Sequence, residues 1–181
     1  GSEMCIRDRD KPTSGVLLFA LDKDSLKAAN ERFAAGRIGK TYHALVRGWI
    51  SQPGELDYPL RPLKDEWKQR GAGETQSART AYAPLDLFEV PEPVGRYKTA
   101  RFCLVELSPA TGRTHQLRRH MAHLRHPIIG DTRHGDGRQN TFFRDGFSSH
   151  RLMLAALKLS LDHPVTGELL CIETAPEQSF L

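Results

Sequence analysis

The chain has 181 residues, of which 39% are hydrophobic, and a formal net charge of +4 at pH 7. This length suits one domain, and the composition is that of an ordinary globular protein. No stretch approaches the length of a transmembrane span and no apolar run opens the chain, so we expect neither a membrane protein nor a signal peptide.

The cysteines point to a reducing compartment. Cys5, Cys103 and Cys171 are odd in number and lack the spacing of a metal site. We therefore expect reduced thiols in a cytoplasmic protein.

The first third of the chain predicts strand, helix and strand. The apolar run 16–21 has the pattern of a buried strand, fed by a polar loop. A helix follows, capped by Asp24 or Ser25 and running to about Ala35. Residues 40–48 alternate in polarity and predict a strand. Its buried face would carry Tyr42, Ala44 and Val46.

The remainder predicts mostly strands joined by short turns. A strand is expected at 55–62, and residues 64–77 read as a mobile surface loop. Further strands are predicted at 79–90, 99–107, 152–161 and 169–174, with a turn at 163–167 and an irregular segment at 132–149. The expected class is α+β, with a largely antiparallel sheet and flanking helices.

The segment from Gly112 to Asp131 is the most unusual part of the chain, with four histidines and four arginines. Leu117, Met121 and Leu124 form one apolar stripe of a helix. That helix is expected to begin at Thr114 as N-cap and to stop before Pro127. Arg118 lies at the edge of the stripe, so we expect it to hold an anion, which could be an internal carboxylate, an RNA phosphate or both.

Basic residues are concentrated between Arg96 and Arg138, where nine lysines and arginines face three acidic residues. Such a surplus is the electrostatic footprint of a nucleic-acid-binding face. A solvated surface with no partner would have the same composition.

Other chemistries fit the sequence poorly. His115 and His120 are five residues apart and point to different faces of a helix, and His123 and His126 are flanked by arginines, whose charge disfavours a metal cation. The chain has no G-x-S-x-G motif and no glycine-rich phosphate loop. We expect neither a metal nor another cofactor.

Three segments carry a resemblance to a known family. DKPTSGVLLFAL from Asp10 resembles the catalytic loop of the RluA-type pseudouridine synthases. KTYHALVRG from Lys40 is similar to the family's strand with the active-site tyrosine, and GRTHQLRRHMAHLRHPIIGD to its arginine segment. Over 96–140, and in the later run RLMLAALKLSLDHPVTGELL, the chain looks closest to the branch that modifies uridine 65 of tRNA.

The resemblance implies a fold, a reaction and a set of residues. The fold would be the pseudouridine synthase catalytic fold, and the reaction would isomerise a flipped-out uridine without a cofactor. Asp10 would be the nucleophile, Arg118 its ion-pair partner, and Tyr42 the ring that stacks on the target uracil. RNA contacts would come from the basic segment, with the candidates Arg113, His115, Arg119, Arg125, Arg133 and Arg138.

The residues before Asp10 depart from the family pattern. Family members carry His-Arg-Leu there, whereas this chain has Arg7, Asp8 and Arg9, and a second negative charge beside Asp10 would repel RNA. Family members also have an N-terminal segment that supplies strands of the sheet. We therefore expect residues 1–9 to be foreign or tag-derived, and residues 10–181 to be a catalytic domain that lacks its first strands and exposes a sheet edge.

The expected protein is a monomeric RNA pseudouridine synthase with tRNA as its partner. One alternative is a relative that acts on ribosomal RNA, because target choice depends on surface loops. Another is a truncated domain that binds RNA without chemistry. A metal-dependent hydrolase using the histidines would be sensitive to chelators.

Overall fold

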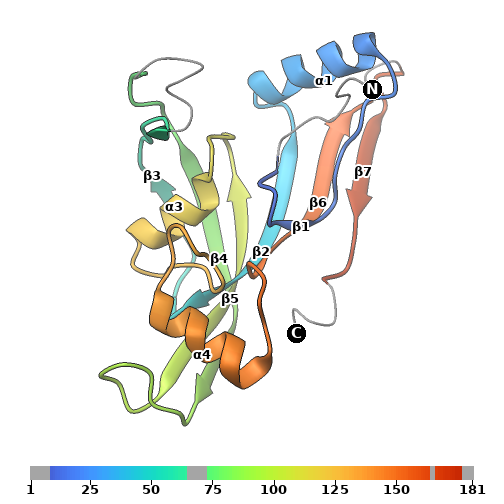
Figure 1. Ribbon diagram of the computed structural model, residues 1–181. Helices are drawn as coiled ribbons and strands as arrows, with labels where there is room; N and C mark the ends of the chain where they lie inside the picture. Colours follow the sequence, from blue (N-terminus) through green and yellow to red (C-terminus); the bar gives the residue numbers. More distant parts are fainter. Residues whose placement is uncertain (1–8, 65–72, 164–165, 177–181) are drawn as a thin grey trace.

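The computed structural model describes residues 9–64, 73–163 and 166–176. These residues form one seven-stranded sheet with three helices around it (Figure 1). The strands are β1 (Ser14–Gly15), β2 (Gly39–Arg47), β3 (Gly54–Asp57), β4 (Arg79–Val90), β5 (Ala100–Pro109), β6 (Leu154–Asp162) and β7 (Leu169–Glu173). The helices are α1 (Lys23–Ala34), α3 (Gln116–His123) and α4 (Gly137–Phe147).

The strand order is β1-β6-β2-β5-β4-β3, and β7 also pairs with β6. β2 is antiparallel to β5 on one side and to β6 on the other, so Tyr42 lies between Leu107 and Ala156. Among the described strands only β1 runs parallel to its neighbour, β6. The predicted α+β class with a largely antiparallel sheet is confirmed.

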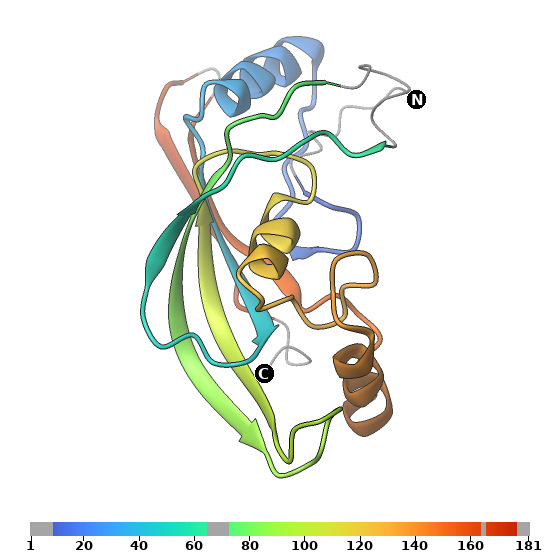
Figure 2. The ribbon, with the colours of Figure 1, turned by 90° about the vertical axis from the view of Figure 1, so that its left-hand side faces the viewer.

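Helix α3 covers the centre of the sheet, on its concave side (Figure 2). The predicted stripe is confirmed, since Leu117 and Met121 are buried and Leu124 is partly buried in one core cluster. The same cluster holds the buried face of β2, Tyr42, Ala44 and Val46, as expected from their alternation. Burial of this apolar surface, at roughly 25 cal/mol per Å², fixes α3 on the sheet.

The predicted boundaries of this helix are wrong at both ends. His115, not Thr114, is the N-cap, and its backbone is left-handed with φ 53°. The helix ends at His123, and Arg125 is also left-handed, with φ 64°. The chain therefore leaves the helix a full turn before Pro127, because a left-handed residue cannot continue it.

Helix α4 packs near the end of the β4–β5 hairpin (Figure 1). Phe143 meets Phe102 of β5 edge to face, with ring centroids 4.8 Å apart. Asp136 caps the helix by accepting hydrogen bonds from the backbone N–H groups of Arg138 and Gln139. The expectation of an irregular segment over 132–149 is therefore wrong for these eleven residues.

Helix α1 follows the first strand segment and packs through Ala29, with Leu26 and Phe33 beside it. Its N-cap is Asp22, whose carboxylate accepts from the Ser25 backbone N–H at 2.7 Å, so the prediction of Asp24 or Ser25 as cap is wrong. Glycine at position 36, with φ 67°, ends the helix region as expected.

Two strand predictions differ from the structure. The strand expected over 16–21 is wrong, because β1 comprises Ser14–Gly15, just before that run, and Phe19 and Leu21 are 58% and 88% exposed. The Val16 N–H donates to the Ala156 carbonyl, and Val16 and Leu18 pack against a core cluster that contains Leu159 of β6. The strand predicted at 55–62 ends at Asp57; beyond it the Tyr58 N–H donates to the Ala78 carbonyl, and Leu60 forms an isolated bridge with Gln76.

Some predictions fall on residues outside the described ranges. Residues 1–8, most of the segment expected to be foreign, are among them. So are residues 65–72 of the expected mobile loop and Pro164 and Val165 of the expected turn. The first and last residues of that turn are described, and there the Gly167 N–H donates to the His163 carbonyl at 3.0 Å.

Candidate active site

The buried arginine of α3 joins two carboxylates from distant parts of the chain. Arg118 Nε and Nη2 donate to the two oxygens of Asp131, each at 2.8 Å. The remaining nitrogen, Nη1, donates to Asp10 Oδ2 at 3.2 Å. The expected ion pair between Arg118 and Asp10 is present. It is the longer and more exposed of the two ion pairs that Arg118 makes.

The Arg118–Asp131 pair is closed off from solvent. The Asp131 side chain is 0% exposed and that of Arg118 is 6% exposed, whereas Asp10 is 22% exposed. Arg118 is directed inward because it follows Leu117 on the buried stripe of α3. The anion that the arginine was expected to hold is therefore an internal carboxylate.

Backbone groups complete the environment of Asp131. Its Oδ1 also accepts from the N–H groups of Arg133 and His134, at 2.9 and 3.0 Å. Burial alone would raise the pKa of Asp131, but Arg118 and these two N–H groups outweigh it, and the pKa lies below its usual value. Burial likewise opposes the charge of Arg118, yet Asp131 and Asp10 raise its pKa.

The loop that carries Asp10 is anchored to the edge of β6. The Thr13 N–H donates to the Asp10 carbonyl at 2.9 Å, and the buried Thr13 leads directly into β1. Gly15 has φ 93°, and a Cβ there would lie 1.9 Å from the Ala156 carbonyl oxygen. Only glycine permits this close approach, which brings the Asp10 loop to the sheet.

Two histidines line the solvent side of the cluster. His115 Nδ1 and His134 Nε2 are 2.9 Å apart, so one ring donates and the other accepts. His115 Nε2 is 4.0 Å from Asp10 Oδ2. Burial lowers the pKa of His115 and lowers that of His134 to about 4, so burial favours the neutral form of both rings.

Tyr42 lies two strands from β1, in the core cluster beneath α3. It is 6% exposed and shares this cluster with Leu117 and Ala156. β6 separates its strand from the Asp10 loop. Its role as the ring that stacks on uracil stays a prediction.

The basic candidates lie in α3 and in the segments beside it, except Arg138, which belongs to α4 and lies next to Gly95. Arg113, Arg125, Arg133 and Arg138 are exposed, and Arg119 is half-buried. Arg113 Nε donates to the Ser77 carbonyl at 3.0 Å, which ties the segment before α3 to the segment before β4. His123 is also exposed and stacks on Tyr58, with ring centroids 3.7 Å apart. Their contacts with RNA stay predictions.

A buried polar network fixes α3 to β4. His120 is 0% exposed and hydrogen-bonds Thr80 Oγ1 at 2.9 Å and the Tyr58 carbonyl at 3.0 Å. Gln116 Nε2 donates to the same hydroxyl and to the Arg79 carbonyl. Burial lowers the pKa of His120. Both residues act as scaffold, because they join α3 to β4 away from Asp10.

Sequence reasoning missed the main partner of Arg118. An internal carboxylate is a possible partner expected from the sequence, but the sequence does not identify Asp131, which both caps the turn at Arg133 and pairs with Arg118. The available signal was its position directly after the apolar run Ile128–Ile129–Gly130, in a segment with few acids. His134 gave no such signal, since a histidine in a polar loop is ordinary.

The described residues contain no group of three or more His, Cys, Asp or Glu side chains placed to hold a metal ion. Within the same ranges, no helix is both long and apolar enough to cross a membrane.

Comparisons with known proteins agree on one family. A family model described as RNA pseudouridylate synthase matches residues 6–123. The chain is 50% identical to tRNA pseudouridine synthase C of Vibrio parahaemolyticus over 174 residues, covering 94% of this chain and 71% of the relative. It is 47% identical to the protein of that name from Salmonella typhimurium, covering 95% and 67%.

Solved structures support the fold. The human protein RNA pseudouridylate synthase domain containing 1 aligns with a TM-score of 0.71 and 28% identity, over 93% of this chain and 66% of that chain. Human RNA pseudouridylate synthase domain containing 4 aligns with a TM-score of 0.69 and 27% identity, over 98% and 72%.

Proposed function

The chain belongs to the RNA pseudouridylate synthase family, and from that premise we propose that it converts a uridine of tRNA to pseudouridine with Asp10 as nucleophile. The family predicted from the sequence is confirmed. The substrate, the target position and the roles of individual residues are proposals.

The observation that carries this proposal is the fixed position of the Asp10 carboxylate. Arg118 holds it at 3.2 Å, and Arg118 is itself held by the buried Asp131. Asp10 keeps 22% of its side chain exposed, so a substrate can reach it. A carboxylate that is oriented and accessible suits nucleophilic catalysis.

The chemistry needs no cofactor. The C1′–N1 bond of uridine breaks, the uracil turns, and a C5–C1′ bond forms while C5 loses its hydrogen as a proton and N1 gains one. Asp10 would add to the sugar or the base and leave again before the product is released. Arg118 would act as a positioning residue, because bidentate pairing with Asp131 leaves only one of its nitrogens for Asp10.

The target base must leave its stack to reach Asp10. An aromatic ring could replace part of that stacking, worth roughly 1–3 kcal/mol. Tyr42 is the proposed ring. Replacing Tyr42 with Phe keeps a ring at this buried position and should preserve activity, whereas Tyr42→Leu should lower it while keeping an apolar core.

We propose uridine 65 of tRNA as the target. The relatives named tRNA pseudouridine synthase C support a tRNA substrate. The similarity of residues 96–140 to the branch that modifies uridine 65 supports the position. The exposed arginines around α3 would contact the phosphates of the folded RNA.

Tritium release tests the reaction directly, because forming the C5–C1′ bond expels the hydrogen from C5. The assay uses tRNA transcribed with 5-tritiated uridine and three proteins: wild type, Asp10→Asn, and Asp24→Asn as a control on the exposed first turn of α1. We expect release by wild type and the control, and none by Asp10→Asn. Equal release by all three would refute Asp10 as nucleophile.

Substrate choice is tested with the same assay. A tRNA carrying cytidine at position 65 should release no tritium if that position is the target. Release from ribosomal RNA but not from tRNA would favour the alternative target. Binding of tRNA with no release from any RNA would favour a domain that binds RNA without chemistry.

A further inference from the structure

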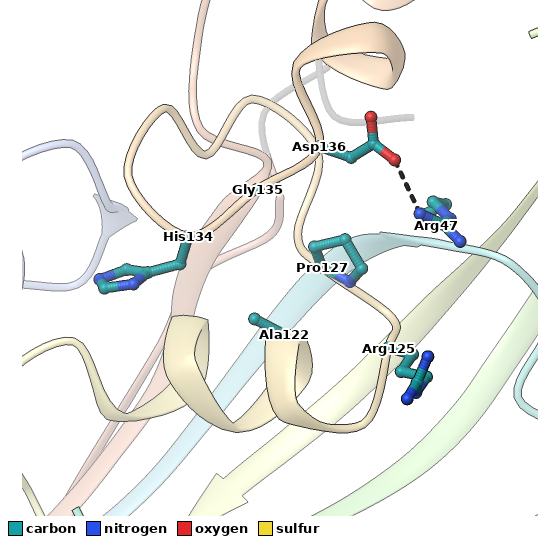
Figure 3. A pocket seen from close by; sticks show the side chains of 7 residues that line it. All are labelled: Arg47, Ala122, Arg125, Pro127, His134, Gly135 and Asp136. Atoms are coloured by element: carbon teal, nitrogen blue, oxygen red, sulfur yellow. Dashed lines mark hydrogen bonds and ion pairs between the residues drawn. The ribbon is translucent and has the colours of Figure 1, made fainter. Parts of the chain in front are cut away.

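A pocket of about 340 Å³ opens beside the candidate active site, between the end of β2, the end of α3 and the loop before α4 (Figure 3). Its volume is at the lower end of the roughly 300–1,000 Å³ of typical ligand pockets, which suits one nucleotide unit. The lining residues are Arg47, Ala122, Arg125, Pro127, His134, Gly135 and Asp136.

The residues divide the pocket into a charged side and a small apolar surface. Figure 3 shows Arg47, Arg125 and Asp136 on one side, with Ala122 and Pro127 between them and His134. An apolar surface flanked by two guanidinium groups matches a nucleotide, which has an apolar sugar face and a negative phosphate.

Arg47 is held at the pocket by the backbone around it. Its N–H donates to the Pro127 carbonyl at 3.0 Å, and its carbonyl hydrogen-bonds His126 Nδ1 at 2.8 Å. Its Nη1 donates to Asp136 Oδ2 at 2.7 Å. Asp136 is itself fixed as the N-cap of α4, so the pair is rigid and still presents other guanidinium donors to a ligand.

Arg125 supplies the uncompensated charge. It lies directly after the C-cap of α3, and its left-handed backbone, with φ 64°, is uncommon for a residue with a side chain. In the described part of the chain its guanidinium has neither an ion pair nor a hydrogen bond. Two arginines and one aspartate leave the pocket with one net positive charge.

The pocket and the catalytic cluster share a wall. His134 lines the pocket and pairs with His115 at 2.9 Å, and His115 lies 4.0 Å from Asp10. A ligand in the pocket would therefore lie on the other side of His134 and His115 from Asp10, which makes the pocket an extension of the candidate active site.

We propose that this pocket binds one backbone phosphate of a nucleotide that flanks the target uridine, through Arg125 and Arg47. The proposal rests on the proposed function, since it assumes that RNA reaches Asp10. It assigns a role to Arg47 and Asp136, with Asp136 acting as a positioning residue for Arg47. Arg125 is the residue whose charge gives the phosphate its affinity.

The left-handed backbone of Arg125 makes a sharp test available. Arg125→Gly removes the guanidinium and suits φ 64°, so the variant should fold at least as well as wild type. Arg125→Ala removes the same group and keeps the strain. Arg144→Ala is the matched control, because Arg144 is exposed on α4 and pairs with its neighbour Asp145.

The measurement is the affinity for a fluorescent RNA stem–loop containing the target uridine, over a range of salt concentrations. Both Arg125 variants should bind about tenfold more weakly than wild type, and the slope of log affinity against log salt should fall by about one. The control should match wild type. Unchanged affinity and slope in Arg125→Gly would overturn the proposal.

A second measurement locates the phosphate from the RNA side. Single methylphosphonate linkages, which remove one phosphate charge, are placed in turn around the target uridine. One flanking linkage should weaken binding by wild type but not by Arg125→Gly. If every linkage weakens both proteins equally, the pocket does not bind a backbone phosphate.

Tritium release separates the failure of this proposal from that of the proposed function. Release by wild type together with unchanged binding by Arg125→Gly would reject the pocket alone. Absence of release by wild type from any RNA would reject the proposed function, whatever the binding result.

Discussion

Replacing Asp131 with Asn tests whether the buried ion pair organises the candidate active site. The change keeps the shape of the side chain but leaves Arg118, 6% exposed, without its main counter-charge. Removing one partner of a buried pair typically costs about 3–5 kcal/mol of stability. Asp10 remains at 3.2 Å as a partial counter-charge, so we expect a loss of about 3 kcal/mol.

Urea unfolding followed by circular dichroism gives the free energy of unfolding of each variant. Asp145→Asn is the matched control, because Asp145 is 64% exposed and its contact with Arg144 is a surface pair, for which a change of at most about 0.5 kcal/mol is expected. A loss below about 1 kcal/mol in Asp131→Asn would refute the reasoning, since the arginine would then not depend on this carboxylate.

The pH dependence of the free energy of unfolding tests the Arg118–Asp131 ion pair independently. The pKa of Asp131 is lower in the folded protein than its usual value, so the folded state binds fewer protons than the unfolded state in acid. Its contribution to stability is thus complete above the usual carboxyl pKa and is lost as the pH falls through the lowered pKa. Asp131→Asn should lack this part of the acid dependence.

Two further predictions concern the surroundings of this pair. Gly15→Ala places a Cβ 1.9 Å from the Ala156 carbonyl oxygen and should lower the free energy of unfolding in urea by at least about 2 kcal/mol. Gly146→Ala, in open space on α4, should raise the free energy of unfolding by up to about 1 kcal/mol. Equal effects of the two substitutions would contradict the close approach of Gly15 to β6. The pKa of His134, about 4, lies below the usual 6.5, so stability should decline as the pH falls from about 6.5 toward 4. His134→Gln should flatten that decline in unfolding midpoints measured at several pH values, and an identical decline would rule out this histidine as its source.

The sheet was largely predictable because its central strands alternate in polarity. The buried side chains Tyr42, Ala44 and Val46 share one core cluster, as their spacing predicts. The run 16–21 was misinterpreted because apolar composition does not distinguish a paired strand from an extended segment. Only pairing with β6, more than a hundred residues away, decides where that strand ends.

Helix α4 was missed because its local signals are weak. Phe143 and Phe147 have helical spacing and Asp136 is a good cap, but the segment contains an asparagine and two glycines, whose helix propensities are low. The packing of Phe143 on Phe102 outweighs these low helix propensities. Tertiary contact, not local preference, forms this helix.

The candidate site was predictable in its parts and not in its connections. Asp10 and Arg118 were identified from motifs, and their contact follows the resemblance. That Arg118 has two carboxylate partners depends on how the loop after α3 folds back, which no sequence spacing indicates. The pocket lined by Arg47, Arg125 and Asp136 could not be predicted for the same reason, because it joins β2 to residues some 80 positions later in the chain.

The two carboxylates around one guanidinium have a consequence for the reactivity of Asp10. Asp10, Arg118 and Asp131 together carry one net negative charge, and the closer contacts of Arg118 go to Asp131. The positive charge of Arg118 is therefore already matched by an ion that takes no part in the proposed reaction. Asp10 is oriented by a hydrogen bond without full compensation of its charge, so when it bonds to a substrate it leaves a balanced ion pair behind rather than a lone buried cation.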